Sequence, residues 1–263
     1  MGTVTAPFSA PDDTERPLFR FRDVGVSYGA MQALSGFSGE IPKGSMLAIL
    51  GPNGGGKSTL LKLMMGQLRA SRGEMRLALP RKGIAYMPQT SDIDRTFPLT
   101  VRDVVASGLF NRVGFYHSFT SDHLALIEQA MRETGITALA DRALDALSGG
   151  QFQRVLFARL LLQHCDVMLL DEPFSGVDAY TVEDLMHLLK SWHQQGKTLI
   201  VVTHDLDLVR EHFPHTLILA RHPVAWGVTE ETLTLDNLRT AKALSRQWSQ
   251  DPRTYAAHPQ MTM

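Results

Sequence analysis

The chain is organised around one stretch, Gly51-Pro52-Asn53-Gly54-Gly55-Gly56-Lys57-Ser58-Thr59. It matches the pattern G-x-x-x-x-G-K-[ST], which is typical of a loop that binds nucleotide phosphates. Residues 46–50 before it are all apolar and predict a buried strand, and residues 58–65 after it predict a helix. Strand, glycine-rich loop and helix therefore follow one another in the order that phosphate binding requires.

The composition of this loop has a physical reason. Glycines let the backbone curl so that several N–H groups face phosphate oxygens, and the helix N-terminus adds the positive end of its dipole. Lys57 is expected to face the β- and γ-phosphates, and Ser58 to offer its hydroxyl to Mg²⁺. The alternative is a glycine-rich turn that binds nothing, and the strand and helix around it argue against that. We expect residues 51–59 to bind ATP.

Composition limits the classes of protein that fit. The chain has 263 residues, enough for one large α/β domain or two small ones, and a formal net charge of −1. A charge so near zero gives no overall basic field for nucleic acid. The lone cysteine, Cys165, cannot form an internal disulfide and fits a reducing compartment. No apolar run approaches the roughly 20 residues that a membrane span needs, so any membrane role should come through a partner chain.

Hydrophobic periodicity predicts an α/β fold with a mostly parallel sheet and helices on both faces. Strands are expected at 18–24, 33–41, 46–50, 73–79, 84–87, 167–170 and 198–203, and helices at 58–65, 101–109, 122–134, 151–163, 178–194 and 205–212. Thr100 is the expected N-cap of the helix at 101–109, and Leu124, Ile127 and Met131 are expected to share one buried face. We predict a loose tail at 1–16, one domain at 17–240 with a helical insertion at about 90–147, and a second tail at 241–263.

A second strong signal is the stretch Val167-Met168-Leu169-Leu170-Asp171-Glu172. Four apolar residues predict a buried strand, and two carboxylates follow at its C-terminal end, the edge at which α/β sheets bind ligands. Asp171 is expected to hold Mg²⁺ and Glu172 to act as general base on the attacking water. Alone, this pair would be interpreted as a surface cap on a strand; together with the phosphate loop it indicates nucleotide hydrolysis.

The most specific stretch is Leu147-Ser148-Gly149-Gly150-Gln151, because it combines a hydroxyl, two glycines and a predicted helix N-terminus in a second anion site. It resembles the signature sequence of ABC transporter ATP-binding subunits. The phosphate loop, signature and acidic strand occur in that family's order, and the resemblance covers about residues 18–220. It implies a RecA-like phosphate-loop core, an N-terminal antiparallel β subdomain and an inserted helical subdomain.

The resemblance also implies roles for further residues. Tyr28 matches the aromatic residue that stacks on adenine, Gln89 the glutamine that reaches Mg²⁺ and the attacking water, and His204 the histidine that contacts the γ-phosphate. Residues 175–178 match a loop that crosses a dimer interface. The implied magnesium ligands are thus Ser58, Gln89 and Asp171, and the implied catalytic residues are Glu172, His204 and Gln89. The remaining implied nucleotide contacts are Ser148, Gly149, Gly150 and Gln151, given to the ATP of a neighbouring copy.

The resemblance further implies an ATP hydrolase that works as a head-to-tail homodimer with ATP between the subunits. Its partners would be an integral membrane permease and an extracytoplasmic substrate-binding protein, and it would lie at the cytoplasmic face of the inner membrane. Residues 96–105, 172–179 and 204–209 are similar to importers of zinc, manganese and chelated iron. The alternatives are an ABC ATPase of another importer or exporter, or one that acts on DNA; the latter usually carries a long coiled coil in place of the helical insertion.

Two further expectations concern particular segments. Residues 91–119 are expected to dock the permease, because they hold the aromatic residues Phe97, Phe110, Phe115, Tyr116 and Phe119 and begin next to Gln89. Packing of these rings within the helical subdomain is the alternative. Gly55 stands where the family commonly has alanine, which should loosen the phosphate loop slightly. The histidines at 212, 215 and 222 have poor spacing for a metal site, and we interpret them as surface residues.

Overall fold

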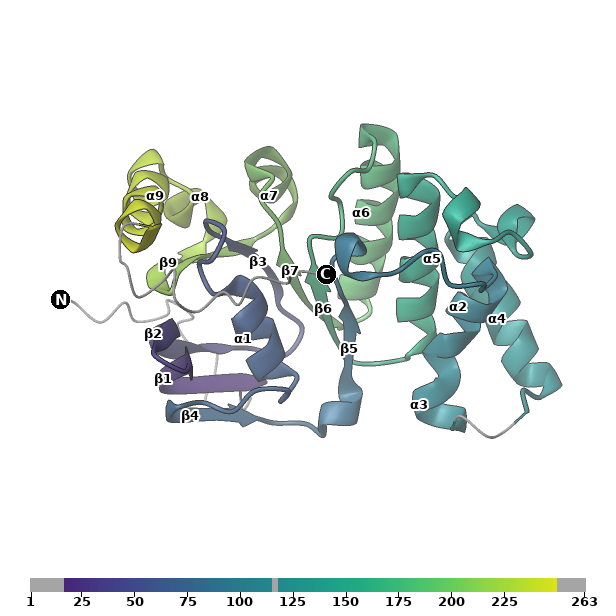
Figure 1. Ribbon diagram of the computed structural model, residues 1–263, viewed down its shortest axis with the longest axis horizontal. Helices are drawn as coiled ribbons and strands as arrows, with labels where there is room; N and C mark the ends of the chain where they lie inside the picture. The colour runs from purple at the N-terminus through teal and green to yellow at the C-terminus, as the bar shows by residue number, and fades with distance from the viewer. Residues whose placement is uncertain (1–16, 115–117, 250–263) are drawn as a thin grey trace. The chain divides into compact units, whose positions relative to one another are not determined.

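The computed structural model describes residues 17–114 and 118–249; the expected N-terminal tail, most of the expected C-terminal tail, Phe115 and Tyr116 lie outside these ranges. The described residues divide into two compact units (Figure 1). Of the described residues, the first unit contains 17–81 and 200–249, and the second contains 82–114 and 118–199. None of the helices in the described ranges is both long and apolar enough to span a membrane.

The first unit contains a three-stranded antiparallel sheet with the strand order β2-β1-β4. Its strands are β1 (Phe19–Tyr28), β2 (Met31–Ile41) and β4 (Arg72–Leu77). Phe19 and Phe21 on β1 are buried, and Phe21 meets Phe37 edge to face at a centroid distance of 4.8 Å. Phe37 in turn stacks on Trp226 at 5.4 Å. The phenylalanine rings form the apolar side of the sheet, as the alternating sequence predicts, and Trp226 of a later strand packs on it.

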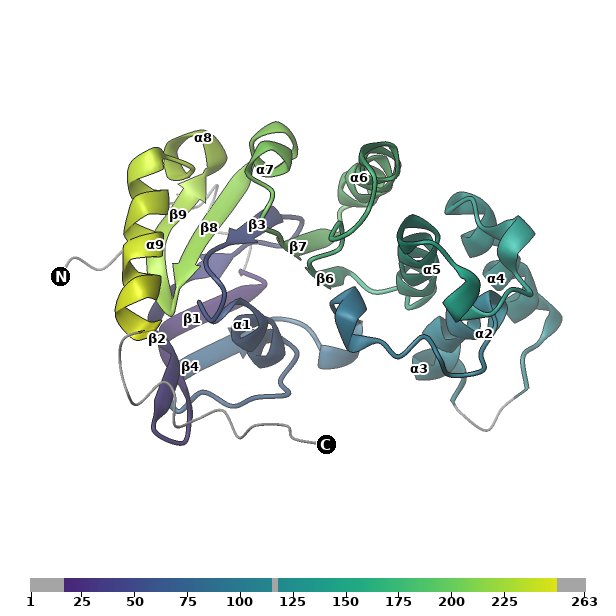
Figure 2. The same cartoon turned by 45° about the horizontal axis from the view of Figure 1, so that its top comes forward.

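The first unit also holds the strands that precede and flank the phosphate loop. β3 (Met46–Leu50) pairs in parallel with β8 (His215–Ala220), and β8 pairs antiparallel with β9 (His222–Val228). All of β3 is buried, as expected for a continuous apolar run in a parallel sheet. The helices are α1 (Lys57–Met64), α7 (Leu206–His212), α8 (Thr229–Thr232) and α9 (Leu235–Ser249). Figure 2 shows α9 running along β8 and β9, against which it packs.

The second unit places helices beside a parallel strand pair. β5 (Ile84–Met87) pairs with β6 (Val167–Asp171), and β7 (Thr198–Val202) carries the chain from this unit into the first. The helices are α2 (Val101–Ala106), α3 (Phe110–Val113), α4 (Ser121–Glu133), α5 (Gly149–Leu162) and α6 (Ala179–Gln194). In Figure 1, α5 lies between α6 on one side and α2 and α4 on the other, and it packs against all three.

Most of the predicted elements and the fold class are confirmed: an antiparallel β subdomain and mostly parallel strands with helices are present. Thr100 is the N-cap of α2, with its side chain bonded to the Asp103 backbone N–H in a capping box. The expected buried face of α4 is wrong at one position. Ile127 and Met131 are buried, but Leu124 is 49% exposed, and Ala130 takes its place on the packed face.

The sequence patterns did not predict β8, β9, α8 and α9. α9 continues to Ser249, across the expected start of the C-terminal tail at 241. Its inward stripe consists of Leu238, Ala241, Leu244 and Trp248, of which Ala241 alone is fully buried among the described residues of the helix. Such a narrow stripe gives a weak periodic signal, because charged residues fill most other positions.

The close approach of the segment 107–109 to α5 gives a stability prediction. A Cβ added at Gly108 would lie 2.3 Å from the carbonyl oxygen of Arg159 and 2.9 Å from Cβ of Leu162. We therefore expect Gly108→Ala to lower the free energy of unfolding by about 1–3 kcal/mol, the usual cost of overpacking. Urea unfolding checks this, with Gly25→Ala as the control, because a Cβ at Gly25 meets nothing nearer than 3.5 Å. Equal stability of the two variants would contradict the prediction.

Candidate nucleotide-binding site

In the first unit the phosphate loop joins β3 to α1. Its conformation is held from within by Lys57, whose Nζ donates to the carbonyl oxygens of Gly51 at 2.9 Å and Pro52 at 3.0 Å. The Lys57 side chain is buried, and α1 begins at this residue with Gly56 as N-cap. Gly56 has φ of 91°, a left-handed conformation that favours glycine. The motif residues thus form the curled loop and helix start that the sequence predicts.

The glycines of this loop have a second function that the motif does not reveal. A Cβ at Gly51 would lie 1.9 Å from the carbonyl oxygen of Leu219, and one at Gly56 would lie 2.5 Å from that of Ala33. The backbones of β8 and β2 thus approach the loop from behind. Glycine is required here for packing against these strands, as well as for exposing N–H groups to phosphate.

Two more predicted residues lie in the first unit. The backbone N–H of Thr203 donates to the carbonyl oxygen of Ile49 at 3.2 Å, so β7 ends beside β3, just before the phosphate loop. His204 follows Thr203 directly and is exposed. It therefore lies at the carboxyl edge of the parallel strands, where ligands of such sheets bind. Tyr28 ends β1 with 40% of its surface exposed, as a ring that stacks on a base would require.

In the second unit the structure brings Gln89 and Glu172 together. The side-chain Nε2 of Gln89 donates to Oε2 of Glu172 at 2.8 Å, across 83 residues of sequence. Both follow the carboxyl ends of paired strands, because Met87 of β5 lies opposite Leu170 of β6. Glu172 has φ of 50°, a conformation that costs energy for a residue with a side chain and is found mostly at functional sites.

The carboxylate edge also affects a neighbouring tyrosine. Burial and the negative charges of Asp171 and Asp92 raise the pKa of Tyr86 to about 12. The Tyr86 hydroxyl is thus neutral at physiological pH. It can donate or accept a hydrogen bond there but carries no charge. Asp171 itself is buried at the end of β6.

The predicted magnesium ligands fit the chemistry of that ion. Ser58 offers a hydroxyl, Asp171 a carboxylate and Gln89 an amide oxygen, and Mg²⁺ prefers such hard oxygen donors. The amide nitrogen of Gln89 donates a hydrogen bond to Glu172. The amide oxygen Oε1 of Gln89 is therefore the atom that a cation would contact. Among the described residues, no three His, Cys, Asp or Glu side chains are grouped to hold a metal ion.

The signature stretch forms the start of α5. Ser148 is the N-cap: its Oγ accepts from the backbone N–H of Gln151 at 3.3 Å, and Oε1 of Gln151 accepts from the backbone N–H of Ser148 at 3.1 Å. The Gln151 side chain therefore caps the helix in this structure, a role that the sequence analysis missed. Its contact with a neighbouring copy's nucleotide stays a prediction.

The signature glycines pack against the loop at 175–178. A Cβ at Gly149 would lie 2.8 Å from the carbonyl oxygen of Gly176, and one at Gly150 would lie 3.2 Å from Oγ1 of Thr181. Asp178 caps α6 and accepts from Thr181 at 3.0 Å and 2.9 Å, which lowers the pKa of Asp178. The two loops that the resemblance assigns to a dimer interface therefore form one continuous surface of the second unit.

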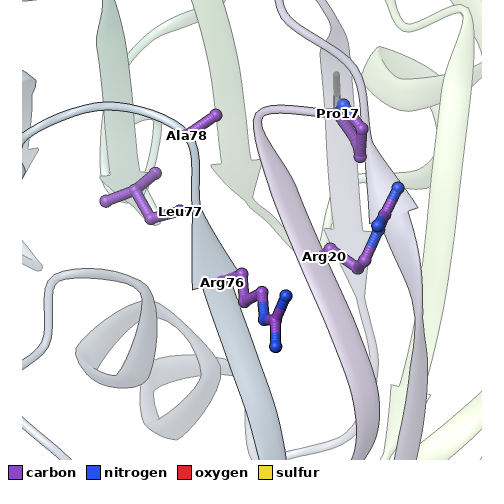
Figure 3. A pocket seen from close by; sticks show the side chains of 5 residues that line it. All are labelled: Pro17, Arg20, Arg76, Leu77 and Ala78. Atoms are coloured by element: carbon purple, nitrogen blue, oxygen red, sulfur yellow. The ribbon is translucent and has the colours of Figure 1, made fainter.

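Other candidate features lie apart from the predicted site residues. Burial raises the pKa of the Cys165 thiol, which keeps it protonated and unreactive. A hollow at the edge of the antiparallel sheet is lined by Pro17, Arg20, Arg76, Leu77 and Ala78 (Figure 3). Its two guanidinium groups already pair with Glu40 and Glu74. The hollow therefore presents no uncompensated charge to a ligand.

The phosphate loop and the helix that it opens are typical of nucleoside triphosphatases of the phosphate-loop class. The ABC transporter family profile matches residues 34–175. The zinc transport system ATP-binding protein TroB of Treponema pallidum is 41% identical over 224 residues, covering 83% of this chain and 84% of that protein. The manganese transport system ATP-binding protein MntB of Listeria monocytogenes is 38% identical over 221 residues, covering 82% and 92%.

Solved structures agree with these relatives. A chain of an inward-facing ABC transporter, described as of metal-chelate type, has a TM-score of 0.78 to this chain at 30% identity, covering 87% of this chain and 90% of that one. The protein CbiO1 of Clostridium perfringens, part of the transporter complex CbiONQ, has a TM-score of 0.72 at 27% identity, covering 89% and 99%. The chain belongs to the ABC transporter family, as an ATP-binding and ATP-hydrolysing subunit.

Proposed function

We propose that this chain powers the import of a divalent transition metal through a separate membrane permease. The metal would be zinc, manganese or iron in chelated form. The identity of the cargo is inferred from two relatives that are named for zinc and manganese transport. Each matches this chain over more than four fifths of its length. The chain would act at the cytoplasmic face of the membrane, held there by the permease. A substrate-binding protein outside the membrane would deliver the metal.

The chemistry of the ATPase follows from the residues at the two strand edges. Lys57 and the loop N–H groups would bind the β- and γ-phosphates, and Tyr28 would stack on adenine. Glu172 would accept the proton of the attacking water, and Mg²⁺, held by Ser58, Asp171 and Gln89, would neutralise charge on the phosphates. His204 would contact the γ-phosphate. The hydrogen bond between Gln89 and Glu172 supports this assignment, because it orients the proposed base.

A second copy of the chain is the proposed source of the remaining phosphate contacts. Ser148, Gly149 and Gly150 would face the γ-phosphate on the neighbouring copy, so that two ATP molecules lie between two subunits. The joint surface of the signature and the loop at 175–178 supports this arrangement. Tyr180 continues that surface in the first turn of α6 and is 86% exposed, a large apolar area that a second copy would cover.

Coupling to the permease would use the segment that follows Gln89. Asp94 orders this loop by accepting from the backbone N–H and hydroxyl of Thr96 at 2.9 Å and 2.7 Å. The Arg95 guanidinium lies 4.0 Å from the centre of the Phe152 ring on α5. Phe97, between these ordered contacts and α2, is 61% exposed. A loop with these internal contacts thus presents one exposed aromatic side chain, as an anchor for a partner protein requires.

Other aromatic residues of this segment serve the subdomain itself. The rings of Phe110 and Phe119 stack at a centroid distance of 6.2 Å, and the Phe119 ring also meets His123 edge to face. Phe115 and Tyr116 lie outside the described ranges. The docking proposal therefore rests on Phe97.

We expect Phe97→Ala to leave basal ATPase of the isolated subunit within about twofold of wild type, because the side chain is exposed. Copurification with the permease should fall by about fivefold or more, the effect of losing an interface anchor worth over 1 kcal/mol. Leu235→Ala is the matched control, because Leu235 is 73% exposed at the start of α9. Loss of basal ATPase or of folding in Phe97→Ala would show that the ring is needed inside the protein instead.

The cargo can be tested in the host cell. A deletion strain should fail to grow under metal chelation, and an excess of the transported metal should restore growth. Zinc, manganese and chelated iron are supplied in separate arms, and the strain is complemented with wild type or Glu172→Gln. Growth restored by one metal and by wild type alone would support the proposal. Growth under chelation that is independent of the chain would contradict it.

The alternative of a DNA-associated ATPase is disfavoured by the insertion between β5 and α5. Its longest helix in the described ranges, α4, has 13 residues, and the insertion folds as short helices packed on α5. A chromosome-clamping ATPase would need a long coiled coil at this place.

A further inference from the structure

The end of β8 lies directly behind the phosphate loop. The carbonyl oxygen of Leu219 approaches so closely that a Cβ at Gly55 would lie 2.9 Å from it. Two residues on, the backbone N–H of Arg221 donates to the carbonyl oxygen of Gly55 at 2.8 Å. The carbonyl oxygen of Arg221 accepts from the backbone N–H of Ser35 at 2.7 Å. The backbone of Arg221 is thus bonded on one side to the phosphate loop and on the other to β2.

This position requires an unusual backbone conformation. Arg221 has φ of 58°, in the left-handed region that favours glycine and that costs energy for a residue with a side chain. Such a conformation persists when surrounding contacts hold it. The side chain supplies one such contact, because the Arg221 guanidinium lies over the ring of Trp248 on α9, with Cζ 4.6 Å from the ring centre.

The Trp248 ring is the one contact of the guanidinium that the described part of the chain shows. The Nε of Arg221 is buried and makes no hydrogen bond within the described residues. The face of the Trp248 ring thus lies beside a guanidinium whose Nε makes no hydrogen bond in the described ranges. A cation over an indole face is attracted to it, and the attraction is larger where water is excluded.

We propose that Arg221 and Trp248 form a latch through which α9 sets the position of the phosphate loop, and with it the affinity for ATP. Arg221 is a positioning residue in this proposal and touches no nucleotide. α9 packs along β8 and β9, so a displacement of the helix would act on Arg221 and then on Gly55. The proposal rests on nucleotide binding at the phosphate loop.

Gly55 is the loop side of this latch. The sequence predicts that glycine here loosens the loop. In the structure both backbone groups of Gly55 are hydrogen-bonded: its carbonyl oxygen accepts from Arg221, and its N–H donates to the Pro52 carbonyl oxygen at 3.0 Å. Alanine would bring its Cβ within 2.8 Å of that oxygen. Glycine at this position therefore permits the close approach of the Leu219 and Pro52 carbonyl oxygens.

The first test changes the aromatic partner in the full chain. We expect Trp248→Leu to weaken ATP binding by about two- to tenfold in calorimetry, because the cation loses the π-face. Trp248→Phe, which keeps an aromatic face, should recover most of the affinity. Turnover at saturating ATP should stay within about twofold of wild type in both variants, because the latch acts on the loop and not on the base. A leucine variant as good as the phenylalanine variant would overturn the proposal.

The second test asks whether the two residues act through one another. Arg221→Gly removes the guanidinium and suits the left-handed backbone, so it should weaken ATP binding as Trp248→Leu does. The double variant should be no weaker than the worse single variant, since both remove the same contact. Arg246→Ala, an exposed arginine in the last turn of α9, is the control and should bind ATP as wild type does. Additive losses of ATP affinity in the double variant, or an equal loss in Arg246→Ala, would contradict the latch. If the wild-type chain bound no ATP, nucleotide binding at the phosphate loop would itself be refuted.

Discussion

Lys57→Ala should lose tight ATP binding, with affinity reduced by roughly 30-fold to 4,000-fold. Removing one partner of a buried, hydrogen-bonded charge pair costs about 2–5 kcal/mol, and 1.4 kcal/mol is tenfold in affinity. Lys57 is expected to contribute in two ways. Its charge would meet the β- and γ-phosphates, and its Nζ already ties the carbonyl oxygens of Gly51 and Pro52 together at 2.9 Å and 3.0 Å. Nucleotide titration by calorimetry measures the combined loss.

A second variant separates these contributions. Lys57→Gln keeps a hydrogen-bond donor for the two carbonyl oxygens and removes the charge, so it should retain the thermal stability of wild type while losing ATP affinity nearly as far. Lys62→Ala, an exposed lysine on the same helix, is the matched control and should bind ATP normally. Wild-type affinity in Lys57→Ala would refute the assignment of the phosphate loop.

The central elements of the fold were predictable because their signals are local. β3 and β5 have the bounds that the sequence predicts, since short apolar runs are closed by turn residues at both ends. The position of α4 in the sequence was predicted correctly, but one residue of its buried face was not. Leu124 is more apolar than Ala130 and dominates a periodicity argument, whereas the folded helix buries the smaller Ala130 side chain and leaves Leu124 exposed.

The C-terminal part was missed for physical reasons. β9 contains Pro223 and Gly227, both of which weaken a strand signal, and β8 begins directly after a helix and a proline. α9 buries few side chains and is charged elsewhere. Its stability thus comes from contacts with β8 and β9, which no local pattern contains.

The site shows the same division between local and distant information. The phosphate loop could be predicted from the motif alone. The family resemblance assigned roles to Gln89 and Glu172, but the hydrogen bond between them, across 83 residues, was not predicted. The contacts of Leu219 and Arg221 with the loop could not be found from sequence, since neither residue belongs to a motif. Their role follows from interatomic distances.

Glu172→Gln should bind ATP with near wild-type affinity and lose turnover by about 100-fold to 10,000-fold, the range expected when a general base is removed. An amide cannot accept the proton of the attacking water. The substitution is otherwise conservative, because the glutamine oxygen can still accept from Nε2 of Gln89 as Oε2 of Glu172 does at 2.8 Å. The backbone conformation at φ of 50° is unaffected by the change. Turnover is measured as phosphate release at saturating ATP and magnesium.

The same variant should accumulate as an ATP-bound dimer on gel filtration, because ATP between the subunits would no longer be consumed. Glu183→Gln, at an exposed position on α6, removes the same charge elsewhere and should hydrolyse ATP at the wild-type rate while remaining monomeric. Normal hydrolysis in Glu172→Gln would exclude Glu172 as the base. Loss of turnover without dimer accumulation would still support Glu172 as the base. It would refute the proposal that a second copy encloses the nucleotide through Ser148 and the glycines that follow it.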